Sequence, residues 1–127
     1  MRFLILILAL LPCAAGAETW KQLFGDYEYV VSVDTDSVER ANGIVKARVR
    51  QHFLKAIPYD DRAYNVLIGL NAFDCKNKKV SLLKVAVYLD TTPLESHEPT
   101  QGAANRLIIP GTVEYFAYRY LCEPEKK

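Results

Sequence analysis

The side chains that could carry out chemistry are few and widely spaced. The chain has two histidines, and neither His52 nor His97 lies at a motif spacing from a nucleophile. His97 lies between Glu95 and Glu98, which could form a weak metal site, although polar loops often have this composition. No nucleophile elbow, phosphate-cradling loop or His-Glu-x-x-His motif occurs. We therefore expect no catalytic residue, cofactor or metal, with an enzyme of unrecognised site as the alternative.

The first residues predict a secretory signal peptide. Arg2 supplies a positive charge, residues 3–11 are uniformly apolar, and Ala15-Gly16-Ala17 provides small residues before a cleavage site. The apolar run is shorter than the roughly 20 residues that cross a bilayer. We predict a cleaved signal peptide over residues 1–17, one domain over residues 18–127, and no transmembrane segment.

Cleavage at this point leaves two cysteines, Cys75 and Cys122. Two thiols in an oxidising compartment have one intramolecular pairing. A zinc site is the rival, but cysteines this far apart without neighbouring histidines make a poor one. The sequence therefore predicts a Cys75–Cys122 disulfide. Lipid attachment at Cys13 is an alternative for the N-terminus, disfavoured because Pro12 occupies a position that should be small.

Charge excludes one class of partner. The chain has 16 Lys and Arg against 15 Asp and Glu, and loss of Arg2 with the signal balances the two. Domains that bind nucleic acid are usually visibly basic, so we expect no nucleic-acid partner. Asp34 and Asp36 could pair as general acid and base, but turn formation explains them more simply.

Alternating apolar residues predict an antiparallel sheet of about five or six strands. Asn42-Gly43 predicts a tight hairpin turn, because both positions tolerate positive φ. Residues 57–62 are expected to be a connection, and residues 90–106 a long polar loop that is either functional or a plain connector. The predicted strands cover residues 27–33, 38–40, 44–53, 63–73 and 80–89.

Residues 112–122 predict a C-terminal helix with Thr112 as its N-cap. An apolar stripe at helical spacing is formed by Val113, Phe116, Ala117, Tyr120 and Leu121. Tyr118 points away from this stripe and is a candidate exposed anchor. The predicted class is α+β, with the helix packed on one face of the sheet and tethered by the disulfide to the hairpin at Cys75.

Candidate binding residues are basic or aromatic, and each has a plainer structural explanation. A basic row along one strand indicates acidic protein or sulfated glycan as ligand, or a solvated sheet face. A C-terminal lysine is the ligand of kringle lysine-binding sites, but also a normal charged terminus. The candidates are Lys46, Arg48 and Arg50, with His52 beside them, the basic turn of Lys76, Lys78 and Lys79, then Tyr118, Lys126 and Lys127.

The ordered features resemble the surface-adhesin protein E family of Gram-negative bacteria. The resemblance begins at Trp20 and ends at Cys122. Between them lie the segments 33–38, Asn42-Gly43, 44–49, Phe73-Asp74-Cys75, Tyr88 and Ile109-Pro110-Gly111-Thr112.

This resemblance implies an antiparallel sheet with a C-terminal helix fastened by the cysteine pair. It also implies a host-interaction protein in the periplasm or at the cell surface, because the best-known members resemble binders of matrix proteins and plasminogen. The expected function is protein–protein interaction. The first alternative is a periplasmic accessory protein that binds another envelope component.

Overall fold

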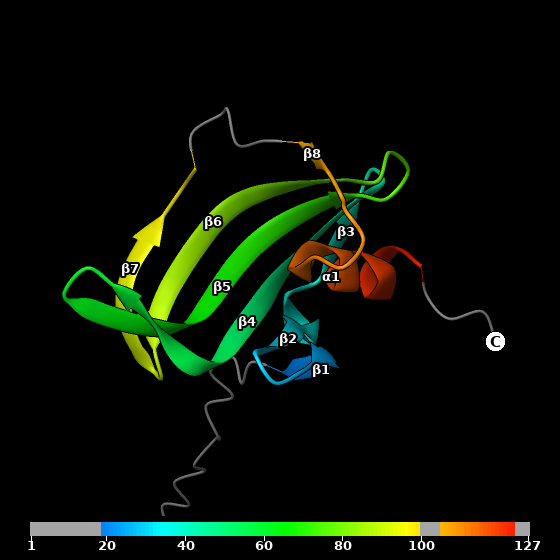
Figure 1. The fold of residues 1–127 in the computed structure, drawn as a ribbon. Coiled ribbons are helices and arrows are strands. Elements are labelled where there is room, and N and C mark those ends of the chain that lie inside the picture. Colours follow the sequence, from blue (N-terminus) through cyan, green and yellow to red (C-terminus); the bar gives the residue numbers. More distant parts are fainter. Residues whose placement is uncertain (1–18, 100–104, 124–127) are drawn as a thin grey trace, which may run out of the picture.

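The computed structural model describes residues 19–99 and 105–123, and it shows an antiparallel sheet curved around one helix (Figure 1). The strands are β1 (Trp20–Gly25), β2 (Tyr29–Asp34), β3 (Glu39–Ala41), β4 (Ile44–Tyr59), β5 (Arg62–Asp74), β6 (Lys79–Leu89), β7 (Thr92–His97) and β8 (Arg106–Leu107). A 3-10 helix, η1 (Thr35–Ser37), follows β2, and the C-terminal helix is α1 (Val113–Cys122).

The predicted α+β class is confirmed, but the predicted strand number is wrong. The described residues form an eight-stranded sheet in the order β1-β2-β4-β5-β6-β7, with β3 paired to β4 and β8 paired to β6. All strand pairs are antiparallel. The additional strands are β1, β7 and β8. β7 lies within residues 90–106, the segment predicted to be a loop, and β8 begins at the last residue of that segment, Arg106.

These missed strands lie at the margins of the sheet, where sequence signals are weak. An edge strand is covered on one side only, so it tolerates charges and proline. β7 contains Pro93 and is mostly polar, yet it pairs with β6 from Val85 to Leu89. β1 shows no regular alternation because its pairing with β2 is interrupted by a bulge between Gln22 and Phe24.

The hairpin turns include one confirmed prediction and one error. Asn42 and Gly43 have φ values of 53° and 78°, as the Asn-Gly signal predicts. The expected connection over residues 57–62 is wrong, because β4 continues to Tyr59 and β5 begins at Arg62. Pro58 is tolerated there because β2 pairs with β4 only as far as Phe53, so beyond that point β4 needs no hydrogen-bond donor on that side.

The strand predicted over residues 27–33 begins later than expected. β2 starts at Tyr29, and Tyr27 is 85% exposed. The side chain of Asp26 explains the difference, because its Oδ1 accepts hydrogen bonds from the backbone N–H groups of Glu28 and Tyr29 at 2.8 and 2.9 Å. These bonds hold residues 26–29 in a turn, which removes Tyr27 from the ladder.

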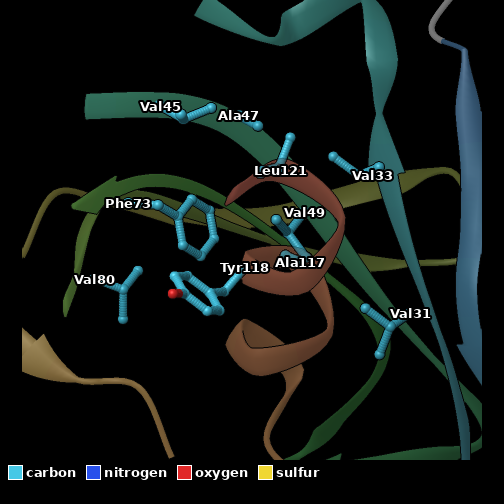
Figure 2. Close-up of a cluster of buried hydrophobic side chains, with 10 residues drawn as sticks. All are labelled: Val31, Val33, Val45, Ala47, Val49, Phe73, Val80, Ala117, Tyr118 and Leu121. Carbon is cyan, nitrogen blue, oxygen red and sulfur yellow. The ribbon is translucent and has the colours of Figure 1, made fainter. Parts of the chain in front are cut away.

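The main hydrophobic core lies between α1 and the sheet (Figure 2). Residues at alternate strand positions face the helix, as the two-residue period of a strand requires. The residues between these positions point to the opposite face of the sheet. The core consists of Val31, Val33, Val45, Ala47, Val49, Phe73, Val80, Ala117, Tyr118 and Leu121.

The helix is capped as predicted, but its buried stripe is rotated. Thr112 is the N-cap, and its Oγ1 accepts a hydrogen bond from the backbone N–H of Tyr115 at 3.3 Å. Tyr118 is only 6% exposed, whereas Tyr120 is 37% exposed. The predicted roles of these tyrosines are therefore wrong. Cys122 must face the sheet to form its disulfide bond. Tyr118 lies four residues earlier on the same face of the helix, so its side chain is buried against the sheet as well.

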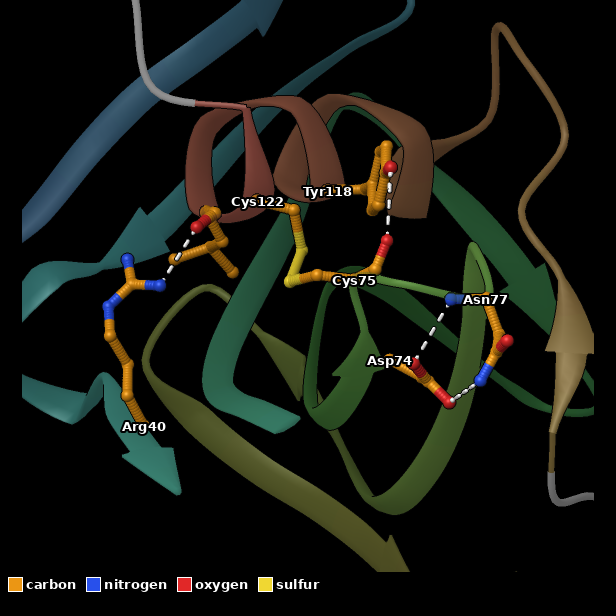
Figure 3. The surroundings of a disulfide bond; sticks show 7 residues. Arg40, Asp74, Cys75, Asn77, Tyr118 and Cys122 are labelled. Atoms are coloured by element: carbon orange, nitrogen blue, oxygen red, sulfur yellow. Dashed lines mark hydrogen bonds between the residues drawn. A yellow bond between two sulfur atoms is a disulfide. The ribbon is translucent and has the colours of Figure 1, made fainter. Parts of the chain in front are cut away.

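The predicted disulfide between Cys75 and Cys122 is present and joins the last turn of α1 to the β5–β6 turn (Figure 3). A hydrogen bond from Arg40 holds the same end of the helix, and a longer, weaker contact from the Tyr118 hydroxyl lies beside it. Arg40 Nη1 donates to the carbonyl of Leu121 at 2.9 Å, and the Tyr118 hydroxyl donates to the carbonyl of Cys75 at 3.5 Å. The helix end is therefore fixed to β3 as well as to the β5–β6 turn.

Candidate functional site

The predicted basic row lies on the sheet face opposite α1. Lys46, Arg48 and Arg50 alternate along β4 with the core residues Ala47 and Val49. Since successive strand residues point to opposite faces, the three basic side chains lie away from the helix. Lys46 is exposed, whereas Arg48 and Arg50 are half-buried.

The two arginines contact a tryptophan that β1 brings beside them. The Trp20 ring centroid lies 4.5 Å from Cζ of Arg50 and 5.5 Å from Cζ of Arg48. Each cation is attracted by the negative face of the indole, at about 0.5–1 kcal/mol per exposed pair. The contacts restrict the rotamers of both arginines and define an Arg–Trp cluster of Trp20, Arg48 and Arg50.

Asp34 forms an ion pair with Arg48 of this cluster. Its carboxylate is nearly buried and lies 3.4 Å from Nη1 of Arg48. The same carboxylate accepts hydrogen bonds from the backbone N–H groups of Thr19 and Asp36, at 3.3 and 3.1 Å. Asp34 therefore caps η1 and holds Arg48, which confirms the turn-forming interpretation of the Asp34–Asp36 pair.

A hollow of about 450 Å³ opens beside the Arg–Trp cluster. Its lining combines basic, aromatic and aliphatic side chains, and aromatic residues and arginine are enriched at protein–protein hot spots. The carboxylate of Asp90 is already held, because it accepts a hydrogen bond from Asn65 Nδ2 at 2.8 Å. The hollow is lined by Trp20, Arg50, His52, Val66, Ile68, Tyr88, Asp90 and Thr91.

The sequence predicts the arginines of this site as binding residues, whereas Trp20 and Tyr88 enter there only as features of the family resemblance. Trp20 was outside every predicted strand, so nothing placed it beside β4. Tyr88 lies on β6 in register with Val66 of β5, two strands from the basic row. The signal that could have found Trp20 is its uniqueness, because it is the single tryptophan of the chain.

The predicted basic turn lies at the other end of β5, away from the hollow. Lys76 and Lys78 are exposed between β5 and β6, and Lys79 is the half-buried first residue of β6. Asp74 organises the turn, because its carboxylate accepts hydrogen bonds from the backbone N–H and Nδ2 of Asn77 at 3.1 and 2.8 Å. The structure therefore separates the two predicted groups of basic residues.

The hydrogen bonds from Asn77 hold the pKa of Asp74 below its ordinary value. A depressed pKa in the folded state contributes stability above the unfolded-state value of about 3.9, and this contribution is lost as the pH falls through the folded-state pKa. Asp74→Asn should therefore destabilise the protein at neutral pH, and the difference from wild type should disappear in strong acid. Urea unfolding at a series of pH values measures this difference.

Asn77→Ala provides the control for Asp74→Asn. This change removes the side-chain donor to Asp74 and leaves the carboxylate and the backbone N–H of residue 77 in place, so the pH-dependent difference should become smaller in an Asn77→Ala background. A difference that stays constant from neutral to acid pH would contradict the assignment.

The remaining polar candidates gather into no metal site among the residues that the structure describes. His97 Nε2 lies 3.2 Å from Glu95 Oε2, and Glu98 is exposed. A hydrogen bond to Glu95 raises the pKa of the Tyr59 hydroxyl. Cys13, Lys126 and Lys127 lie outside the described residues.

Comparison with known families identifies the chain. The sequence model of the family described as Surface-adhesin protein E matches residues 20–123. The chain belongs to the surface-adhesin protein E family. The match begins at Trp20 and extends one residue beyond Cys122, so it includes the Arg–Trp cluster and both bonded cysteines.

Family membership confirms the resemblance found in the sequence. The family is one of surface adhesins, which points to a binding protein that is exported or located at a surface. A search of curated proteins found no match. Within the described residues, the adhesin E fold contains no helix long and apolar enough to cross a membrane.

Proposed function

We propose that this chain is exported from a Gram-negative bacterium and binds a protein partner through the hollow beside Trp20. The observation that carries the proposal is the contact of Arg50 with Trp20, both of which line this hollow, with Arg48 on the same indole ring. Export depends on the expected signal peptide over residues 1–17. Family membership supports the choice of a binding protein over an enzyme.

The composition of the hollow favours a protein surface as ligand. Tryptophan, tyrosine and arginine are enriched at binding hot spots because they combine large apolar area with directed hydrogen bonds. Trp20, Tyr88 and Arg50 line the hollow together with the aliphatic side chains of Val66 and Ile68. The contact with Trp20 orders the Arg50 side chain before binding, which reduces the entropy lost when a partner arrives.

Family membership supports a protein as the partner, and the specific partners are proposals. Host extracellular-matrix proteins and plasminogen are the first candidates, since the family is one of surface adhesins. Another component of the bacterial envelope is the alternative partner. Both assignments use the same hollow, and binding to host proteins is the outcome that favours the first.

Trp20→Ala should weaken partner binding about 30-fold, which corresponds to the loss of a 2 kcal/mol hot spot. The substitution removes the ring that contacts both arginines and one wall of the hollow. Biolayer interferometry with immobilised vitronectin, laminin and plasminogen measures the change. Circular dichroism should show that the variant remains folded.

Tyr27→Ala is the matched control, because Tyr27 is an aromatic residue 85% exposed in the β1–β2 turn. Its binding should equal that of the wild type. A variant lacking Lys126 and Lys127 should keep its affinity for plasminogen if the hollow is responsible. Saturable binding to none of the three proteins would overturn the adhesin assignment, and equal binding by Trp20→Ala would overturn the assignment of the hollow.

A further inference from the structure

A second surface lies at the β8 edge of the sheet, where two large apolar side chains point to solvent. Leu107 is 66% exposed and Ile109 is 63% exposed. Ile108, between them, packs against the core. This alternation is that of an extended segment with one face on the protein and the other outward.

The basic β5–β6 turn is directly beside this segment. Leu107 is in register with Lys79, and the backbone N–H of Ile108 donates to the carbonyl of Lys78 at 3.0 Å. We call the combined surface the basic–apolar edge; it consists of Lys76, Lys78, Lys79, Leu107 and Ile109. The sequence analysis found its lysines, but not the apolar residues that the fold places next to them.

The charge of the basic–apolar edge is positive. Arg106 forms an ion pair with Glu114, so these two residues offset each other. Asp74 is the carboxylate of the turn, and its oxygens accept from Asn77. The three lysines therefore outnumber the acidic groups of the turn.

A small hollow adds to the edge. It has a volume of about 240 Å³ and lies next to the two exposed apolar side chains. It is lined by Val80, Arg106, Leu107, Ile108, Ile109, Thr112 and Glu114. The mostly apolar lining fits an aliphatic side chain from a partner.

We infer that the basic–apolar edge binds an extended acidic segment of a partner protein, in which carboxylates alternate with aliphatic side chains. The carboxylates meet the lysines, and the aliphatic side chains cover Leu107 and Ile109. An extended segment matches the two-residue spacing of these side chains. Among residues 19–99 and 105–123, β8 pairs with β6 alone, and a strand edge of this kind can take an added strand. This surface is separate from the hollow beside Trp20 and does not depend on the ligand of that hollow.

Two other occupants fit the surface less well. A sulfated glycan would satisfy the lysines but would leave Leu107 and Ile109 uncovered. A second copy of the chain, paired about a two-fold axis, would place the same patch against itself. The lysine turns would then approach each other, and like charges across an interface are unfavourable.

Fluorescence anisotropy with a labelled ten-residue peptide of alternating glutamate and leucine tests the inference. The full chain should bind this peptide saturably, and added salt should weaken the complex because exposed charges are screened. The double variant Leu107→Ser/Ile109→Ser should bind at least about tenfold more weakly, and Lys76→Glu/Lys78→Glu should lose a similar factor. A peptide of alternating lysine and leucine should not bind.

Matched controls come from the β4–β5 arm. Leu54 is 60% exposed and Lys55 follows it on β4, so Leu54→Ser and Lys55→Glu repeat the same chemical changes elsewhere on the surface. Both variants should bind the peptide like the wild type. Trp20→Ala should also leave peptide affinity unchanged, which separates a failure at the edge from a failure at the hollow.

Three results would overturn the inference. The first is no saturable binding of the peptide. The second is that polyglutamate binds as tightly as the glutamate–leucine peptide and that Leu107→Ser/Ile109→Ser does not weaken its binding. This result would indicate a general polyanion site. The third is a concentration-dependent dimer in sedimentation analysis that the same double variant abolishes, which would assign the edge to a second copy of the chain.

Discussion

Replacing both Cys75 and Cys122 by serine should lower the free energy of unfolding by about 4 kcal/mol. The bond links residues 47 positions apart, and in the chain-entropy model a loop of this length restricts the unfolded chain by that amount. A domain of this size has a total stability of about 5–15 kcal/mol. The substitution should therefore remove a large share of the stability of the protein.

Urea denaturation followed by circular dichroism measures this loss. The reduced wild-type protein is the control, and its midpoint should coincide with that of the double serine variant. A decrease below about 1 kcal/mol would contradict the prediction. Such a result would mean that burial of α1 alone holds the helix on the sheet.

Tyr118→Ala should cost about 3–5 kcal/mol, the range for truncating a large buried aromatic residue, whereas Tyr120→Ala should cost less than about 1 kcal/mol. The reason is burial, because Tyr118 is in the core beside Phe73 and Leu121. Tyr120 instead lies at the surface, with its ring centroid 5.0 Å from Nζ of Lys21. The two variants make the same chemical change two residues apart on one helix.

Thermal and urea unfolding of the two variants provide the comparison. Tyr118→Phe is a further control, since its ring is kept and the hydroxyl contact with the Cys75 carbonyl, at 3.5 Å, is too long to contribute much. Its stability should be close to that of the wild type. Equal losses for Tyr118→Ala and Tyr120→Ala would show that the helix is rotated relative to the structure.

The parts of the fold that the sequence predicted depend on local chemistry. Asn42-Gly43 specifies its turn because both residues accept positive φ. Thr112 specifies the start of α1 because its side chain accepts a backbone N–H of the first turn. The cysteine pair was predictable because two thiols have one intramolecular pairing. None of these predictions requires knowledge of distant strands.

The errors occur where a distant contact outweighs a local pattern. The stripe containing Tyr120 fits an ideal helix, but the bond at Cys122 turns the helix so that Tyr118 is buried instead. β7 is polar and contains Pro93, so it becomes a strand only because β6 offers a free edge.

Only part of the candidate site could be predicted from the sequence, because one part depends on a local pattern and the other on a distant contact. The alternation of Arg48 and Arg50 along β4 is local, and the sequence predicted it. Their contact with Trp20 is not local, because β2 lies between β1 and β4 in the sheet order. Only the order of the strands brings the indole over both guanidinium groups.

The covalent link also determines how the protein would respond to a pulling force. If tension is applied between β1 and the residues beyond Cys122, the load passes through the sulfur atoms from Cys75 to Cys122. The intervening segment, including β6, β8 and the basic–apolar edge, is then shielded from stretching. Trp20 and Arg50 lie outside this covalent loop, so a mechanical pull would stretch the strands of the hollow, while the segment that carries the basic–apolar edge would bear no tension.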